Sequence, residues 1–256
     1  RFNPDEQSIF GNIYKTDQFR IYGIKQRDLL EEGLEIKQNK NEMFENKLSG
    51  EYNGSKWGGK YLRAPEIFFT IIDKNKNNLL LELKDVARVK AGILTGKNEL
   101  YYKSKENNFD NNKYSLVFKS PREINKILVT ESDAVSIIKK KNVPFNIRKA
   151  PLLWVDLRGD KHICHFNKDR LPFEHNFYGI EEKNGNNLKL CLLLNSTLTY
   201  LLVEVLGRKG LGGGAIRLVK EDLLKMSCLN IDKINNLEIS KYQHLLNRKI
   251  YSVFQE

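Results

Sequence analysis

The chain has 256 residues and a mass of 29.8 kDa, enough to bury a substantial core in one domain with flanking segments. Hydrophobic residues make up 40% and aromatic residues 10%, while a mean hydropathy of -0.52 argues against a membrane protein. The formal net charge of +11 directs attention to polyanionic partners such as nucleic acid. Because lysine and asparagine are abundant throughout, a solvated surface without such a partner also explains this charge.

The cysteines and the first residues indicate a cytoplasmic setting. Cys164, Cys191 and Cys228 are too few and too widely spaced for a disulfide framework, which indicates a reducing compartment. The first residues show no signal peptide or apolar anchor, and we expect no membrane attachment. Since the sequence opens at Arg1 without a methionine, we expect a fragment of a longer polypeptide.

The N-terminal segment is expected to end one domain and lead into a connector. Residues 13–30 begin with alternating apolar positions and pass into a polar stretch typical of a helix. Residues 31–54 are rich in Glu, Lys, Asn and Gly with little periodicity, as in a solvated connector. We therefore predict a domain boundary near residue 50.

The next segments predict a short helix and a loop held between two strands. Pro65 and Glu66 suit the first turn of a helix, which we place at residues 65–73 and expect to be mostly buried. In LLLELKDVARVKAGILTGKNELYYKS, residues 95–98 suit a loop, whereas residues 100–102 have the aromatic, extended character of a strand.

Residues 106–185 alternate short apolar stretches with Asn, Lys, Pro and Gly, a pattern typical of a small antiparallel sheet with long connections. Within this range AVSIIKKK is interpreted as a helix. In KHICH, strand alternation sends His162 and Cys164 to one face and His165 to the other, so we expect no metal site there.

The C-terminal third predicts helices. The apolar segment 187–207 indicates a buried helix that ends at Gly207, and Glu204 with several hydroxyl residues marks it as core and not a membrane span. Residues 234–254 have the spacing of an amphipathic helix. We predict an α+β fold, with a mixed or antiparallel small sheet, packed helices and a C-terminal amphipathic helix.

No segment carries the motifs of a catalytic centre. The sequence has no proline pair, and its glycine cluster follows a helix instead of a parallel strand, so we find neither the base pocket nor the methyl-donor turn of an adenine methyltransferase. We predict no catalytic residue, metal site or cofactor in this chain. Two alternatives stay open: a metal-dependent nuclease using Asp5, Glu35 and Lys37, and a protein-interaction domain that docks through the terminal helix and segment 188–206.

Three loops combine residue types that suit DNA contacts. KWGGKYLR offers cations for phosphates and Trp57 as a flat surface, although packing at a domain junction explains Trp57 equally well. LTGKNELYY carries side chains of the kinds that contact base edges or phosphates, and GRKGLGGGAIR is either an anion-binding nest or a tight structural turn. The predicted DNA-binding residues are Lys56, Trp57, Lys60, Arg63, Thr95, Lys97, Asn98, Arg208, Lys209 and Arg217.

Three segments in this order resemble a known family: KWGGKYLRAPEIFFTII, LKDVARVKAGILTGKNELYY and LLLNSTLTYLLVEVLGRKGLGGGAIRLVKEDLLKM. They are similar to the TaqI-like C-terminal specificity domain of adenine-specific DNA methyltransferases and Type IIG restriction-modification enzymes. The second segment also resembles the start of target-recognition domains in Type I specificity subunits. The resemblance implies the end of a methyltransferase domain and a linker at 1–50, a target-recognition domain at 51–232 and a C-terminal helix at 233–256.

The resemblance also implies a function. It predicts sequence-specific recognition of double-stranded DNA by a chain that is itself non-catalytic. The implied partners are double-stranded DNA and the methyltransferase domain of the same polypeptide, which would use S-adenosylmethionine. The whole enzyme is expected to methylate adenine, with or without endonuclease activity.

Overall fold

The computed structural model describes residues 13–15, 20–23, 25–36, 50–52, 64–75, 78–106, 108–159, 161–208, 215–234 and 240–247. The chain divides into two compact units, residues 1–66 and 67–256. The predicted boundary near residue 50 and the predicted segments 51–232 and 233–256 stay predictions.

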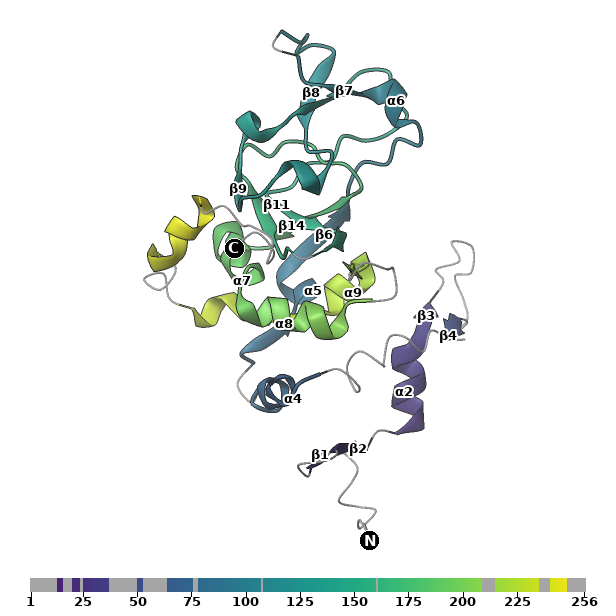
Figure 1. Cartoon of the computed structure of the whole chain (residues 1–256), viewed down its shortest axis with the longest axis vertical. Coiled ribbons are helices and arrows are strands. Elements are labelled where there is room, and N and C mark those ends of the chain that lie inside the picture. Colours follow the sequence, from purple (N-terminus) through teal and green to yellow (C-terminus); the bar gives the residue numbers. More distant parts are fainter. Residues whose placement is uncertain are drawn as a thin grey trace. The chain divides into compact units, whose positions relative to one another are not determined.

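The described residues of the first unit form two antiparallel strand pairs and a helix (Figure 1). Their bounds are β1 (Ile13–Lys15), β2 (Arg20–Tyr22), α2 (Gln26–Gly33), β3 (Leu34–Ile36) and β4 (Gly50–Tyr52). Strand β1 pairs with β2, and β3 pairs with β4. Helix α2 begins within the stretch that the polar pattern predicted as helical.

A five-stranded sheet forms the centre of the second unit. Its order is β6, β14, β11, β13, β9, with bounds Ala87–Ala91, Phe177–Glu182, Leu152–Val155, Cys164–Asn167 and Leu128–Val129. All neighbours pair antiparallel except β13 and β9, which run parallel. The sheet is therefore mixed, and with the helices around it the predicted α+β class is confirmed.

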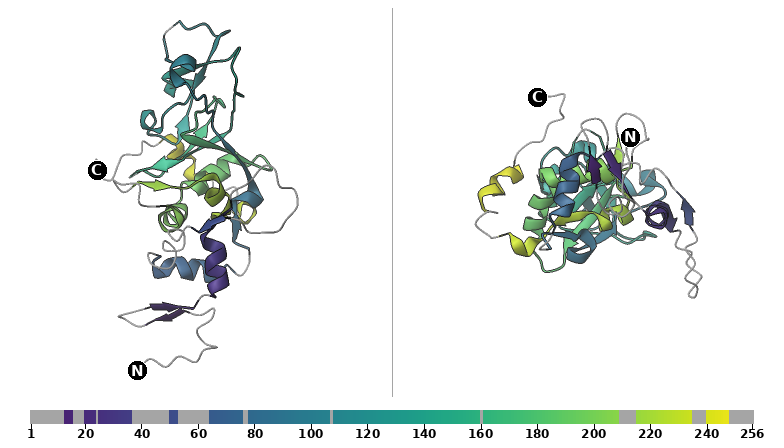
Figure 2. Two further views of the ribbon diagram at one scale, coloured as in Figure 1. Left: turned by 90° about the vertical axis from the view of Figure 1, so that its right-hand side faces the viewer. Right: turned by 90° about the horizontal axis from the view of Figure 1, so that it is seen from below.

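A three-stranded antiparallel sheet follows the loop after β6. Its order is β7 (Tyr102–Ser104), β10 (Ser136–Lys139), β8 (Tyr114–Val117), and it lies above the central strands in Figure 1. The left view of Figure 2 keeps this teal part of the chain at the same end of the second unit. A core that includes Phe118, Phe173 and Phe177 packs next to these strands.

Two predictions about this sheet were wrong. AVSIIKKK was expected to be helical, but β10 pairs with a neighbour on each side, and Ile137 and Ile138 are both buried. Interstrand hydrogen bonds and two buried β-branched side chains outweigh the lysines that suggested a solvated helix. Leu100 and Tyr101, expected in a strand, lie in the helical turn α6 (Asn98–Tyr101), and the strand begins at Tyr102.

The helices of the second unit include α4 (Glu66–Asp73), α5 (Leu83–Val86), α7 (Asn187–Leu194), α8 (Thr197–Leu206) and α9 (Lys220–Lys225). Helix α4 confirms the helix predicted at 65–73; Phe68 and Phe69 are buried there, whereas Ile67 is 54% exposed. Helix α7 contacts β13 and β14, and α9 contacts β6.

The segment predicted as one helix over residues 187–207 is two helices, bent by 62°. Asn195 causes the break: its side-chain amide donates to the Cys191 and Cys164 carbonyls, and its Oδ1 accepts from the Cys164 N–H. The Ser196 hydroxyl then accepts from Thr199 N, which starts α8 as an N-cap. Among the described residues no single helix is long and apolar enough to cross a membrane, although α7 and α8 pass that test together as a bent pair.

Short elements complete the second unit. Two further antiparallel pairs join β5 (Leu80–Glu82) to β16 (Ser227–Leu229) and β12 (Leu157–Arg158) to β15 (Ile216–Arg217). The 3₁₀ turns are η2 (Pro121–Glu123), η3 (Glu131–Asp133), η4 (Ile231–Lys233) and η5 (Gln243–Asn247). The predicted C-terminal amphipathic helix is not confirmed: residues 240–242 are helical and lead into the 3₁₀ turn η5, whereas 235–239 and 248–254 lie outside the described residues.

Candidate nucleic-acid interface

Exposed basic side chains gather on the outer side of β6 and around it. We call this surface the basic face, and it consists of Arg88, Lys90, Arg148, Lys149 and Arg170. Strand alternation explains its first part, because the side chains of Ala87 and Val89 are buried while those of Arg88 and Lys90 face solvent.

Side-chain contacts of Arg170 and Arg148 and a backbone pairing of Lys149 bring these residues close to β6 and β14. Glu181 of β14 lies opposite Arg88, and its carboxylate is 3.8 Å from Lys90 Nζ and 3.4 Å from Arg170 Nη1. Arg148 Nη1 donates to the Ala91 carbonyl at 2.7 Å, at the end of β6. Lys149 pairs by its backbone with Pro172, two residues after Arg170.

The charge of this face is incompletely balanced. Among the described residues, Glu181 is the carboxylate that contacts it, against five basic side chains. Exposed pairs of this kind hold their cations weakly, since water and salt screen the attraction. The basic face can therefore exchange its contact with Glu181 for contacts with phosphate oxygens.

The loop that contains Thr95, Lys97 and Asn98 follows directly after the basic face. Its start is fixed, because a Cβ on Gly92 would lie 2.2 Å from the backbone oxygen of Glu174. Within the loop, Thr95 Oγ1 donates to Asn98 Oδ1 at 2.5 Å, and Lys97 and Asn98 are exposed. The structure thus brings these three predicted residues together at one end of β6.

The other described members of the predicted set make internal ion pairs. Arg208 Nε lies 2.8 Å from Asp222, and Arg217 contacts Asp156 through Nε and Nη2, the latter at 2.9 Å. Such pairing accounts for these two arginines without DNA. The remaining predicted residues, Lys56, Trp57, Lys60, Arg63 and Lys209, lie outside the described residues.

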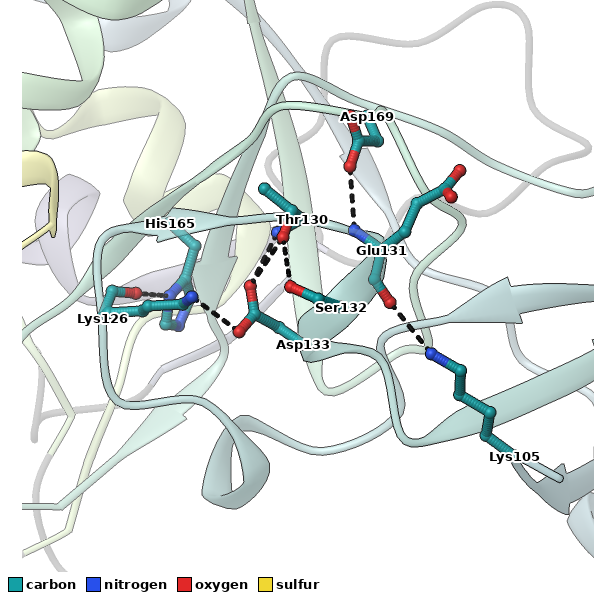
Figure 3. A network of polar contacts seen from close by, with 8 residues as sticks. All are labelled: Lys105, Lys126, Thr130, Glu131, Ser132, Asp133, His165 and Asp169. Carbon is teal, nitrogen blue, oxygen red and sulfur yellow. Dashed lines mark hydrogen bonds and ion pairs between the residues drawn. The ribbon is translucent and has the colours of Figure 1, made fainter. Parts of the chain in front are cut away.

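A polar network holds the η3 turn between the two sheets (Figure 3). Asp133 Oδ2 accepts from the N–H of Thr130 at 2.8 Å and from its hydroxyl at 3.1 Å, while Oδ1 lies 2.7 Å from Lys126 Nζ. Burial alone would raise the pKa of Asp133, but the hydrogen bonds from Lys126 and Thr130 lower it overall.

The same turn is tied to both sheets through Glu131. Its N–H donates to Asp169 Oδ2 at 2.8 Å, just after β13, and its carbonyl accepts from Lys105 Nζ at 3.2 Å, just after β7. The three-stranded sheet and the central sheet are therefore joined by directional bonds as well as by apolar packing.

The KHICH histidines donate to backbone carbonyls instead of meeting at one point. His162 Nε2 is 2.7 Å from the Leu194 carbonyl and His165 Nδ1 is 2.8 Å from that of Lys126, so these nitrogens carry the protons. Burial lowers the pKa of each ring to about 4. Cys164 is fully buried, and burial with the neighbouring Cys191 raises its thiol pKa.

Within the part of the chain that the structure describes, no three His, Cys, Asp or Glu side chains gather as metal ligands. Of the residues in the nuclease alternative, Glu35 lies in β3 opposite Glu51, and Asp5 and Lys37 lie outside the described residues. These residues therefore give that alternative no geometric support.

Sequence reasoning missed the basic face. Its local signal was ARVKA, where basic residues alternate with small or branched apolar ones on a strand. The approach of Arg148, Lys149 and Arg170 has no such signal, because it depends on pairing between distant segments.

Comparisons with known proteins agree with this architecture. The described part of the second unit is an α+β body built on a mixed five-stranded sheet. The chain is similar in fold to the crystal structure of the type IIG restriction endonuclease BpuSI, with a TM-score of 0.62 and 9% identity over 80% of this chain. It spans about 30% of the length of BpuSI.

A second similar structure is the HsdS subunit from Thermoanaerobacter tengcongensis, with a TM-score of 0.39 and 12% identity over 66% of this chain and 40% of that one. No family model matches the sequence, and no curated protein matches it. The comparison with BpuSI therefore shows a fold shared with a type IIG restriction endonuclease.

Proposed function

We propose that this chain recognises double-stranded DNA in a restriction-modification enzyme. The observation that carries the proposal is the basic face, where five exposed basic residues include two, Lys90 and Arg170, that share one carboxylate, on a fold shared with a restriction endonuclease. Phosphate contacts made by lysine and arginine supply most sequence-independent affinity for DNA. The basic face would hold the DNA backbone, and the adjoining Thr95–Asn98 loop would lie against the duplex.

The proposal includes the finer assignment that the sequence resemblance implies. We propose that the chain is part of an adenine-specific DNA methyltransferase or Type IIG enzyme, acts in the cytoplasm and selects a site for a separate methyltransferase domain. That domain would bind S-adenosylmethionine. The described residues of this chain contribute recognition and no catalytic group.

The test is the salt dependence of duplex binding. We expect the triple variant Arg88→Gln/Lys90→Gln/Arg170→Gln to bind duplex DNA more weakly. The slope of log affinity against log salt should become shallower by about one for each cation that contacts a phosphate. Binding is measured by fluorescence anisotropy with labelled duplexes, and a competition with random-sequence DNA measures the sequence preference.

A matched control removes the same charge elsewhere. Lys74, Lys225 and Lys233 are exposed and lie outside the basic face. Their triple change to glutamine should leave the slope close to that of the wild type. Equal losses in the two triple variants would remove the basic face as the DNA contact, and a wild-type chain that binds no duplex would overturn the proposed function.

A further inference from the structure

A second group of cations lies around Tyr114 in the three-stranded sheet. We call this group the lysine cluster, and it consists of Lys103, Lys113, Lys139, Lys140 and Lys141. The Lys103 ammonium lies 5.3 Å from the centre of the Tyr114 ring, and Lys139 is paired with Tyr114 in the strand register. The Lys140 N–H donates to the Lys113 carbonyl at 2.8 Å. Three strands that are distant in the sequence therefore bring these lysines together.

The charge of the lysine cluster is incompletely balanced. Among the described residues, Asp110 is the carboxylate that forms an ion pair with the cluster, 3.7 Å from Lys113 Nζ. Both side chains of that pair are exposed, so water and salt screen the attraction. Lys103, Lys140 and Lys141 are exposed as well, and an ammonium in water needs no internal carboxylate. The cluster is thus available to a polyanion.

Two segments of the chain connect the lysine cluster to the basic face. The first leads from Lys90 on β6 through the Thr95–Asn98 loop to Lys103 on β7. The second leads from Lys141, just after β10, to Arg148. Each segment therefore has a basic residue of the basic face at one end and a lysine of the cluster at the other.

Contacts between the two segments hold them side by side. Arg148 Nη1 donates to the Ala91 carbonyl at the end of β6. The rings of Tyr101 and Phe145 meet edge to face, with their centres 5.1 Å apart. Phe145 and Ile147 are partly buried against a core that begins at the end of the loop. The basic face and the lysine cluster are therefore held in a fixed relation by packed residues.

The two basic surfaces are close enough for one duplex. Lys141 precedes Arg148 by seven positions (148 − 141), so their Cα atoms are at most about 25 Å apart. Duplex DNA rises about 3.4 Å per base pair, which makes this span about seven base pairs. A duplex of about one helical turn, roughly 34 Å, can therefore reach both surfaces, with the Thr95–Asn98 loop along the connection between them.

We propose that the lysine cluster is a second phosphate-binding surface and that one duplex contacts it together with the basic face; the proposal rests on the proposed function. Phosphates recur along a duplex whatever its sequence, and a lysine is a compact charge on a flexible stem. The cluster can therefore bind the DNA backbone without a fixed register. It adds affinity and positions the duplex, but it reads no base.

Salt dependence tests the lysine cluster separately from the basic face. Lys103→Gln/Lys140→Gln/Lys141→Gln removes three exposed charges. We expect a shallower slope of log affinity against log salt, by about one for each of these lysines that contacts a phosphate. The loss of affinity should be the same on preferred and random-sequence duplexes, because phosphate contacts carry no sequence information.

Two further variants control for charge and folding. Lys103→Arg/Lys140→Arg/Lys141→Arg keeps the three charges and should keep the wild-type slope. The triple glutamine control described for the basic face also lies outside the lysine cluster, and its slope should stay that of the wild type. Thermal unfolding followed by circular dichroism verifies that each variant is folded.

Stoichiometry tests whether one duplex reaches both surfaces. The wild-type chain is mixed with an excess of a duplex about two helical turns long and studied by sedimentation velocity. We expect one duplex per chain, because the two surfaces share it. Two duplexes per chain would show separate sites and would overturn the joint contact.

The remaining outcomes separate this proposal from the proposed function. An unchanged slope in the lysine-to-glutamine variant, together with a shallower slope in the basic-face variant, overturns the lysine cluster as a DNA contact and leaves the proposed function intact. A wild-type chain that binds no duplex contradicts the proposed function itself.

Discussion

Basic residues are compensated very differently in two regions of the second unit. Near α8 and α9, three described arginines each pair with a carboxylate of their own: Arg158 with Glu204, Arg208 with Asp222, and Arg217 with Asp156. On the basic face, Lys90 and Arg170 share the carboxylate of Glu181, which lies opposite Arg88 in the strand register. Near α8 and α9 the positive charges are therefore neutralised by carboxylates of the same fold. On the basic face most of the positive charge is left for a negatively charged partner.

Burial explains the difference. Arg158 is 5% exposed, and moving a guanidinium out of water is costly unless a carboxylate compensates for the lost hydration. Lys90 and Arg170 keep more than half of their side-chain surface in water, at 52% and 55%, and need no such partner. Whether a lysine or arginine can bind a polyanion therefore depends more on the carboxylates around it than on which of the two residue types it is.

The largest expected effect comes from protonating His162 and His165, which adds positive charge inside the second unit. His162 and His165 have pKa values of about 4 in the folded chain against an ordinary 6.5, so the unfolded chain takes up protons first as the pH falls. Their contribution to stability is complete above pH 6.5 and is lost between pH 6.5 and 4. We expect the free energy of unfolding to decrease by about 2 to 3 kcal/mol per ring between pH 7 and 4.5.

Urea unfolding at the two pH values measures this effect. His165→Gln removes one of the two rings and should therefore reduce the decrease in unfolding free energy by about half. His244→Gln changes an exposed position and should leave the decrease unaltered. A wild-type free energy of unfolding that stays constant from pH 7 to 4.5 contradicts the neutral, buried state of both rings.

Much of the fold follows from local sequence patterns. Pro65 and Glu66 place α4, and the alternation of the middle segments indicates the antiparallel strands. The errors arise where one side chain or one neighbour decides the structure. Asn195 splits a continuous apolar run because its amide satisfies three backbone groups, and β10 is a strand because it has a partner on either side.

The candidate site was predictable only in part. Thr95, Lys97 and Asn98 are neighbours in the sequence, so their convergence in one loop was visible from it. The basic face joins residues up to 82 positions apart (170 − 88), and the pairs that occupy Arg208 and Arg217 also depend on the tertiary fold. A list of basic residues cannot separate arginines compensated by a carboxylate from those that are not.

The second prediction removes one partner of a buried pair. Arg158→Met keeps much of the side-chain volume but leaves Glu204, 30% exposed, without its 2.6 Å contact. We expect the free energy of unfolding to fall by about 2 kcal/mol, less than for a fully buried pair because water reaches Glu204. Arg88→Met on the basic face should change it by no more than about 0.5 kcal/mol. Equal losses in the two variants would contradict the contrast between the regions.

The smallest expected effect concerns Arg217, which the sequence analysis predicted as a DNA-binding residue and which the structure pairs with Asp156. Arg217 is 47% exposed, yet its guanidinium binds Asp156, which is 13% exposed. Because this pair is partly solvated, Arg217→Gln should cost about 0.5 to 1 kcal/mol of stability. If the pair satisfies the arginine, the same variant should leave the salt slope of duplex binding unchanged, whereas Arg88→Gln should make it shallower by about one. Anisotropy titrations at several salt concentrations distinguish the two, and a slope change of about one in Arg217→Gln would extend the DNA contact beyond the basic face.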